Sequence, residues 1–441
     1  MVTDMNPLAE ELNSILAGTV AEGLLSALGR RMYFPRGIIA QAAEARELAP
    51  VKNATIGMAF HHGQPLILSA VAERVGGLSP GETVAYAPTA GFEPVRRAWK
   101  DLLIRKNPSL DPGWFSLPVV VPGITAGISY AADLFLDKKK TILAGDPCWE
   151  NYELIFTGRR GAALRGIPFL GAAGSEGGGP DGGLDIKAIE GALKEEAKTG
   201  VLKLILNFPH NPSGYSPTTA EARALAGLIN EIAEDGAKVL VICDDAYFGL
   251  VYEESACRES LFSILANLHP RVLAVKVDGP TKEDYVWGLR MGFLSFGARG
   301  LGEEHYGALI KKLMGIIRSS VSCTNSPAQH LMLRAMEDPR TAEEKQRFYG
   351  MLKRRYGLVK DYIRNYGGGG RLEALPFNSG YFMSFRCRGI DAETLRRRLL
   401  SEQNIGTIAL GPSFLRVAFA ALEEEQIPEV YQAIYKTAGA L

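Results

Sequence analysis

Short apolar runs rich in β-branched residues alternate with longer amphipathic stretches through the middle of the chain. Helical patterns at 128–136, 186–198 and 219–233 separate several of the runs, which are 118–121, 141–144, 163–168, 202–207, 239–243, 272–277 and 292–296. Alternation of this kind is typical of a mostly parallel sheet with helices on both faces. The pattern therefore predicts an α/β fold with seven strands in its main sheet.

The two ends of the chain follow other patterns. Apolar positions three and four residues apart predict one helix over residues 8–28. After residue 327 the pattern predicts helices at 339–366, 392–402 and 424–435, with strands at 380–386 and 415–419. We therefore expect an N-terminal helix and arm over residues 1–60 that packs with the small domain, a large domain over 61–327, and a small α+β domain over 328–441.

Composition and charge narrow the class of protein. The 441 residues are 46% apolar and carry 49 basic and 49 acidic side chains, so the formal net charge is zero. This balance indicates a folded protein and argues against nucleic-acid binding by bulk charge. The five cysteines form no CxxC pair, which is typical of reduced thiols and predicts a cytoplasmic protein. No HExxH or CxxC spacing occurs, so we expect no metal site.

Several candidate site residues follow the predicted strands, at the edge where such sheets bind ligands. Gly123, Ile124 and Thr125 open a helix after the first run, which suits an anion, although an ordinary capped helix has the same pattern. Trp149 follows the second run, where its ring would either stack on a flat ligand or fill a domain junction.

Polar residues also follow the fourth, fifth and sixth runs. Asn211 lies in a proline-rich turn, and Asp244 and Tyr247 come directly after the fifth run. A carboxylate there needs a cationic partner if it is buried, whereas a helix cap or a tight turn would also explain these residues. Lys282 and Arg290 follow the sixth run, either as surface charges or as part of a site for a phosphate and a carbonyl group.

Taken together and in order, these segments resemble the class I and II aminotransferases, pyridoxal-phosphate enzymes of the aspartate-aminotransferase fold. The matching segments are YAPTAG at 86–91, GITAG at 123–127, NFPHNPSG at 207–214, DDAY at 244–247, TK with GLRMG between 281 and 292, TNSP at 324–327 and LR at 415–416. The resemblance implies a large domain that binds pyridoxal 5'-phosphate.

The resemblance also implies a role for each matching residue. Lys282 would hold the cofactor as an internal aldimine, and Asp244 would pair with its protonated ring nitrogen. The remaining implied cofactor contacts are Asn211 and Tyr247 at the ring hydroxyl, Trp149 on the ring face, Gly123, Ile124, Thr125 and Arg290 at the phosphate, and Tyr86 reaching the phosphate from a neighbouring subunit. The catalytic set would be Lys282, Asp244 and Tyr247. A homodimer with shared active sites follows from the role of Tyr86.

The resemblance implies fewer contacts to the substrate than to the cofactor. Arg416 would bind the α-carboxylate, and Asn211 and Gly37 would contact the substrate as well. Arg36 and Asn378 are further candidates, with surface charge and loop turn as alternatives. Gly279 stands where the family usually has a hydroxyl, which Thr281 or water would replace. Arg318 lies close to the position of the arginine that selects dicarboxylates but is not a clean match, so the donor class stays open.

Three functions are compatible with these residues. The first is an aminotransferase that moves an amino group from an L-amino acid to a 2-oxo acid, most simply 2-oxoglutarate. The second is a carbon–sulfur β-lyase or a ring-forming synthase that uses the same lysine and aspartate. A non-catalytic regulator on the same fold is disfavoured because the segment before the first match is short and the net charge is zero.

Overall fold

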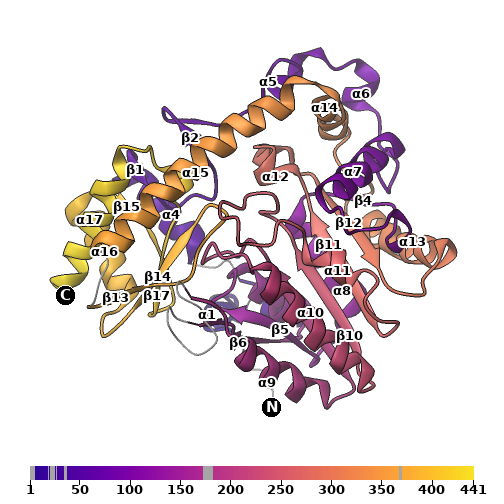
Figure 1. The fold of residues 1–441 in the computed structure, drawn as a ribbon, viewed down its shortest axis with the longest axis horizontal. Helices are drawn as coiled ribbons and strands as arrows, with labels where there is room; N and C mark the ends of the chain where they lie inside the picture. The colour runs from indigo at the N-terminus through magenta and orange to yellow at the C-terminus, as the bar shows by residue number, and fades with distance from the viewer. Residues whose placement is uncertain are drawn as a thin grey trace.

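The computed structural model describes residues 5–17, 19, 25, 27–33, 37–171, 182–366 and 370–441. Its centre is a seven-stranded sheet in the order β4-β12-β11-β10-β9-β5-β6 (Figure 1). The strands are β4 (Val119–Val121), β5 (Thr141–Asp146), β6 (Ala163–Pro168), β9 (Val201–Asn207), β10 (Lys238–Asp244), β11 (Val272–Asp278) and β12 (Gly292–Gly297). Each coincides with a predicted run, so the predicted α/β class and strand count are confirmed.

Strand direction places the ends of the central strands together. The pairs β5–β6, β5–β9, β9–β10 and β10–β11 are parallel, whereas β12 is antiparallel to both β11 and β4. The carboxyl ends of β9, β10 and β11 therefore meet at one edge. In open sheets of this kind that edge is where ligands bind.

Helices cover both faces of the large sheet, as Figure 1 shows. On one face α8 (Ile124–Phe135), α13 (Glu303–Ser320) and the π-helix Glu153–Arg159 enclose one apolar core. On the other face α7 (Glu93–Lys106), α9 (Ile186–Ala197), α10 (Thr219–Glu234) and α11 (Leu261–Leu265) enclose a second core. A short helix α12 (Pro280–Glu283) follows β11, and α14 (Ser326–Glu337) leads out of this part.

A smaller sheet forms the C-terminal part. It is antiparallel, in the order β13-β14-β17-β16, and consists of β13 (Leu372–Ala374), β14 (Met383–Cys387), β16 (Ile408–Leu410) and β17 (Phe414–Val417). The helices around it are α15 (Arg340–Tyr366), α16 (Ala392–Gln403) and α17 (Gln426–Gly439). In Figure 1 the long α15 runs from beside α14 to the C-terminal helices.

The N-terminal segment contacts both the large and the small part of the molecule. It contains α1 (Pro7–Leu16), α3 (Ala27–Arg31), α4 (Ile38–Leu48) and β1 (Lys52–Asn53). Arg31 donates to the carbonyl oxygen of Gly158 in the large part at 3.1 Å, and β1 pairs in parallel with β15 (Ile405–Gly406) of the small part. The prediction of one helix over 8–28 is wrong, because Ala17 takes an extended conformation and ends α1.

The remaining elements are short. They are β2 (Phe60–His61), β3 (Gln64–Pro65), α5 (Ser69–Ala72), α6 (Pro80–Val84), β7 (Leu170–Gly171) and β8 (Gly183–Leu184), with 3-10 turns at Val75–Gly77, Pro112–Trp114, Trp287–Leu289 and Phe419–Ala421. Among the helices of the described residues, none has the length and apolar character needed to cross a bilayer.

Candidate active site

One pocket lies at the carboxyl edge of the central strands. Its walls are Ile124, Thr125, Trp149, Asn207, Asn211, Asp244, Ala246, Tyr247 and Lys282. Seven of these nine residues are candidates that the sequence predicts, contributed by five separate segments of the chain. The fold thus brings together side chains up to 158 positions apart, between Ile124 and Lys282.

Asp244 is the last residue of β10 and is 3% exposed. Its carboxylate accepts a hydrogen bond from the hydroxyl of Tyr152 at 2.5 Å and from the backbone N–H of Ala246 at 3.2 Å. Burial raises the pKa of Asp244 to about 6, although the bond from Tyr152 and the charge of Lys282 oppose that rise. A carboxylate in this environment gains stability from a cation placed against it.

Lys282 lies in the turn of α12, just beyond β11. Its Nζ is 5.2 Å from the ring centroid of Tyr247, which is 5% exposed. Burial lowers the pKa of Lys282 to about 8; the carboxylate of Asp244 opposes this shift and the guanidinium of Arg290 adds to it. The neutral form, which attacks a carbonyl carbon, is therefore more populated near neutral pH than it is for an exposed lysine.

Three glycines form a cradle around the start of α8. Gly123 has φ +92°, and a Cβ there would lie 2.6 Å from a guanidinium nitrogen of Arg290. A Cβ on Gly279 would lie 2.9 Å from the Cα of Gly292, and one on Gly292 would lie 2.9 Å from the backbone nitrogen of Ile124. Backbone N–H groups at a helix start beside an arginine suit a phosphate group.

The hydroxyl expected to replace the missing one at Gly279 is engaged elsewhere. Thr281 is 5% exposed, and its Oγ1 donates to the carbonyl oxygen of Met291 at 3.4 Å. Thr125 lines the pocket at the first turn of α8. The described residues therefore offer the hydroxyl of Thr125, and not that of Thr281, to an anion in the cradle.

Arg416 comes from the small sheet and contacts Asn211 in the pocket wall. It lies in β17, is 3% exposed, and donates to Asn211 Oδ1 at 3.1 Å and to the carbonyl oxygen of Thr55 at 3.0 Å. Its guanidinium stacks on Phe382 at 4.4 Å, and its buried Nε has no hydrogen-bond partner among the described residues. Burial lowers the pKa of Arg416 to about 10, opposed by Tyr247 and Glu150. An unsatisfied donor on a buried guanidinium favours a carboxylate ligand.

Gly37, the predicted substrate contact, and Gly57, which was not predicted, have different neighbours. Gly37 caps α4, where a Cβ would lie 2.0 Å from an oxygen of Glu150, whose carboxylate accepts from the backbone N–H of Ile38 at 3.1 Å. Gly57 lies beside the ring of Tyr247, because a Cβ there would lie 3.5 Å from the hydroxyl of Tyr247 and 3.3 Å from Phe382. Sequence reasoning missed Gly57.

Three other predicted residues lie away from the pocket walls. Tyr86 is 90% exposed, and Arg318 is exposed in the last turn of α13. Asn378 is buried in a reciprocal pair of 2.8 Å hydrogen bonds with the backbone of Ser216, so its role here is structural. Arg36 lies outside the described residues.

Tyr152 and Asn207 belong to the candidate site through their contacts with Asp244, and sequence reasoning did not select them. Tyr152 packs edge-on against Trp149, with ring centroids 5.5 Å apart. The Asn207 side chain donates to the carbonyl oxygen of Asp244 at 2.8 Å and accepts from the backbone N–H of Asn211 at 2.7 Å. Their positions in the sequence could have indicated both residues, because Tyr152 lies one helical turn after Trp149 and Asn207 ends a predicted strand.

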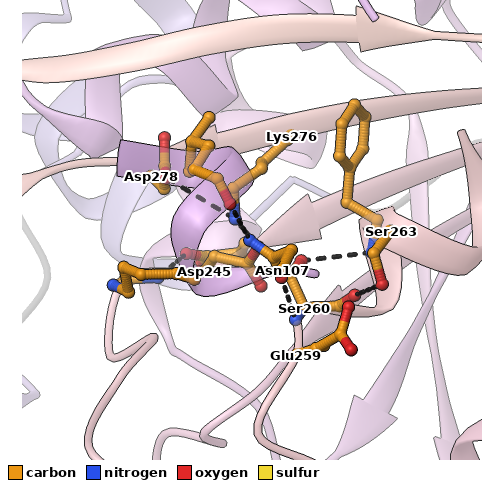
Figure 2. Close-up of polar contacts among 12 residues, drawn as sticks. Asn107, Asp245, Glu259, Ser260, Ser263, Lys276 and Asp278 are labelled. Carbon is orange, nitrogen blue, oxygen red and sulfur yellow. Dashed lines mark hydrogen bonds and ion pairs between the residues drawn. The ribbon is translucent and has the colours of Figure 1, made fainter. Parts of the chain in front are cut away.

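A buried ionic cluster lies next to the pocket. It consists of Asp245, which follows Asp244, and of Lys276 and Asp278, which precede Lys282. Figure 2 shows Lys276 between the carboxylates of Asp245 and Asp278. Lys276 is 0% exposed, Asp245 also accepts from the hydroxyl of Ser260 at 2.5 Å, and Asp278 accepts from Trp99 Nε1 at 3.2 Å. Burial alone would lower the pKa of Lys276, but the two carboxylates raise it. The cluster ties the end of β10 to the end of β11.

The fold and the pocket together define an α/β enzyme with a half-buried lysine, a buried carboxylate and an anion cradle at one sheet edge. A sequence model of the family described as aminotransferase class I and II matches residues 62–434. The chain therefore belongs to the class I and II aminotransferases, a family of pyridoxal-phosphate enzymes, as the resemblance predicted.

Two curated relatives match part of the chain. The aspartate aminotransferase of Salmonella typhi is 28% identical over 170 residues, which are 38% of this chain and 40% of that protein. A probable N-succinyldiaminopimelate aminotransferase of Mycobacterium tuberculosis is 27% identical over 202 residues, 45% of each chain. The chain thus matches less than half the length of each of these relatives.

Solved structures match over nearly the whole chain. An aminotransferase from Anaerococcus prevotii is 22% identical with a TM-score of 0.82, covering 94% of this chain and 99% of that one. A mutant of Thermus thermophilus aspartate aminotransferase is 20% identical with a TM-score of 0.73 and the same coverage. At these identities the matches show the shared fold.

Proposed function

We propose that this protein is a pyridoxal-phosphate-dependent aminotransferase that moves an amino group from an L-amino acid to a 2-oxo acid, with 2-oxoglutarate as the acceptor. The observation that carries the proposal is that one pocket holds both Lys282 and Asp244, while Arg416 bonds to Asn211 in its wall. The pKa of the amine is lowered, the carboxylate is buried, and the guanidinium keeps a free donor. Family membership supports the same reaction.

The residues of the pocket fit the cofactor at both of its ends. The glycine cradle at Gly123, Gly279 and Gly292, beside Arg290, would hold the phosphate. Trp149 would cover the ring, Tyr247 and Asn211 would contact the ring hydroxyl, and Asp244 would face the ring nitrogen. Lys282 Nζ would attach the cofactor covalently at its aldehyde carbon.

Each group in the pocket then has a chemical task. When bound, pyridoxal phosphate supplies an electron sink for the charge left when the substrate Cα loses its proton. Asp244 would keep the ring nitrogen protonated, and the bond from Tyr152 would keep Asp244 ionised. Lys282 Nζ, once free, would accept the Cα proton and return it. Arg416 would hold the α-carboxylate so that this proton points toward Lys282.

The experiment is a donor panel read by absorbance in single half-reactions. Adding an L-amino acid alone to the loaded protein should convert the cofactor to its amine form, and 2-oxoglutarate should restore the original spectrum. Release of pyruvate and ammonia without an acceptor would identify a β-lyase instead.

Substitution of the lysine tests its assignment. Lys282→Ala should lose both the covalently bound cofactor and turnover, whereas Lys187→Ala, on the exposed surface of α9, should keep both. Asp244→Asn should keep the bound cofactor and slow the half-reaction about 100-fold or more. A Lys282→Ala protein that retains covalent cofactor would refute the proposal.

A further inference from the structure

The turn that carries Lys282 is held by a tyrosine of the small part. Tyr381 is 0% exposed, and its hydroxyl donates to the backbone carbonyl oxygen of Lys282 at 2.8 Å. Its ring packs edge-on against Tyr247, with centroids 5.4 Å apart. Tyr381 therefore contacts both the lysine backbone and the ring beside the lysine amine, without lining the pocket itself.

Tyr381 is also connected to the residue that would bind the substrate carboxylate. The next residue, Phe382, stacks under the guanidinium of Arg416 at 4.4 Å. Phe382 directly precedes β14, and β14 pairs with β17, where Ser384 is opposite Arg416. A displacement of Arg416 relative to the large sheet thus moves Phe382 and Tyr381 with it, because they are joined by covalent bonds and strand hydrogen bonds.

Ion pairs hold the same turn from two sides. Glu283 pairs with Lys106 of α7 at 2.5 Å, and with Lys345 of α15 at 3.3 Å. Lys345 also bonds to Asp284 at 2.8 Å. Helix α15 is packed with the small sheet's helix α17. The segment after Lys282 is therefore anchored to both parts of the molecule, and Tyr381 is the anchor nearest to the lysine.

We propose that Tyr381 is a positioning residue that couples occupancy of the carboxylate site at Arg416 to the position of Lys282. The proposal rests on the function proposed above. When a carboxylate binds the free donor of Arg416, the Phe382–Tyr381 segment shifts, and the hydrogen bond to the Lys282 carbonyl passes that shift to the turn of α12. The lysine then takes its reactive position only when a substrate carboxylate is present.

The test compares two tyrosines that make the same kind of bond. Tyr381→Phe removes the hydroxyl that donates to Lys282. Tyr252→Phe removes a buried hydroxyl, on a residue 2% exposed, that donates to the neighbouring Gly380 carbonyl at 2.8 Å. Each change removes one oxygen and leaves the ring in place, so both proteins should fold with similar small losses in melting temperature.

The readout is the pH titration of the absorbance of the lysine-bound cofactor. It is measured in the resting protein and with carboxylates that carry no amino group: butyrate, succinate and 3-phenylpropionate. In the parent protein and in Tyr252→Phe, a carboxylate that binds should shift the titration midpoint. In Tyr381→Phe that shift should fall by more than half, while the carboxylate still binds to saturation. In steady state we expect kcat to fall about tenfold with little change in KM.

Two results would overturn the coupling. One is a folded Tyr381→Phe protein that shows the parent shift, and the other is a parent protein whose titration does not move with any carboxylate that binds. Lys345→Gln provides an independent variant on the same turn, and a reduced shift is expected there too. Failure of the coupling is separable from failure of the proposed function, because the latter would appear as absence of lysine-bound cofactor in the parent protein.

Discussion

The amine of Lys282 is reactive because its turn places it out of bulk water and beside Arg290. Burial and that guanidinium outweigh the carboxylate of Asp244, so the pKa falls to about 8. An exposed lysine titrates about two units higher. Asp244 and Arg290, which we propose to contact the cofactor, thus also set the charge of the amine that we propose attaches to it.

The first residue-scale prediction concerns attachment of the cofactor to protein prepared without it. Only the neutral amine attacks the aldehyde, so the second-order rate should rise about tenfold per pH unit below the midpoint and level off above it. With the pKa at about 8, the plateau should begin between pH 8 and 9. Stopped-flow absorbance measures the rate. A rate that climbs steadily to pH 10 would contradict a lowered pKa.

A second prediction concerns the hydroxyl of Tyr152. Its hydrogen bond lowers the pKa of Asp244, so Tyr152→Phe should move the acid limb of the kcat/KM profile to higher pH. Tyr215→Phe is a suitable control, because that hydroxyl donates to Glu221 at 2.6 Å, outside the pocket. An unchanged acid limb in Tyr152→Phe would show that Asp244 does not control it.

Some residues of the site were predictable because each follows directly on a predicted strand. Asp244 ends β10, and Lys282 follows β11 by four positions. Gly57 and Phe382 were not predictable from such a rule, since they lie in irregular segments whose position depends on packing between the two parts. Gly37 was proposed as a substrate contact, and the structure places Gly57 nearer to the catalytic ring.

At the scale of elements, the ends of β10 and β11 are joined by the cluster around Lys276. One lysine pairs with two carboxylates there, and all three side chains are nearly inaccessible to water. Removing only the cation leaves buried charge without a partner, which is usually far more costly than replacing the whole group by neutral residues. The positions of Asp244 and Lys282 relative to each other therefore depend on the charges of this cluster.

We predict that Lys276→Met lowers the free energy of unfolding by about 3–5 kcal/mol. The variant that combines Lys276→Met with Asp245→Asn and Asp278→Asn should lose markedly less, because no buried charge remains. Denaturant titration of both proteins, loaded with cofactor, makes the comparison. Equal losses in the two variants would show that packing, and not charge, determines the contribution of this cluster.

The elements of the main sheet were predictable because buried parallel strands read as short continuous apolar runs. All seven runs became strands, and the helices between them agree within a few residues. The expected helix over 8–28 failed because periodicity alone does not reveal where a helix ends. The glycine-rich segment at 171–183 lies mostly outside the described residues.

At the scale of the whole molecule, two large side chains close together in the sequence are unusually exposed to solvent. Tyr86 is 90% exposed and Val84, two residues earlier, is 80% exposed, although both are apolar. We propose that a second copy of the chain covers them and that Tyr86 reaches the phosphate cradle of that copy. The protein would then be a homodimer in which each site needs both chains.

This proposal predicts that Tyr86→Phe retains the dimer but loses cofactor faster during dialysis, by about tenfold for one lost hydrogen bond to a charged group. Sedimentation velocity measures the oligomer, and residual absorbance measures the cofactor. Tyr366→Phe, an exposed tyrosine at the end of α15, serves as the control. Cofactor retention equal to the parent's would remove Tyr86 from the site.

The bond from Arg416 to the Thr55 carbonyl has a consequence for how this chain can change. A residue among the first sixty thus helps to orient the arginine that we propose to bind the carboxylate, whereas the lysine, the aspartate and the anion cradle come from the middle of the chain. If the proposed function holds, substitutions near Thr55 would change how firmly the α-carboxylate is held and leave the residues proposed for the chemistry in place.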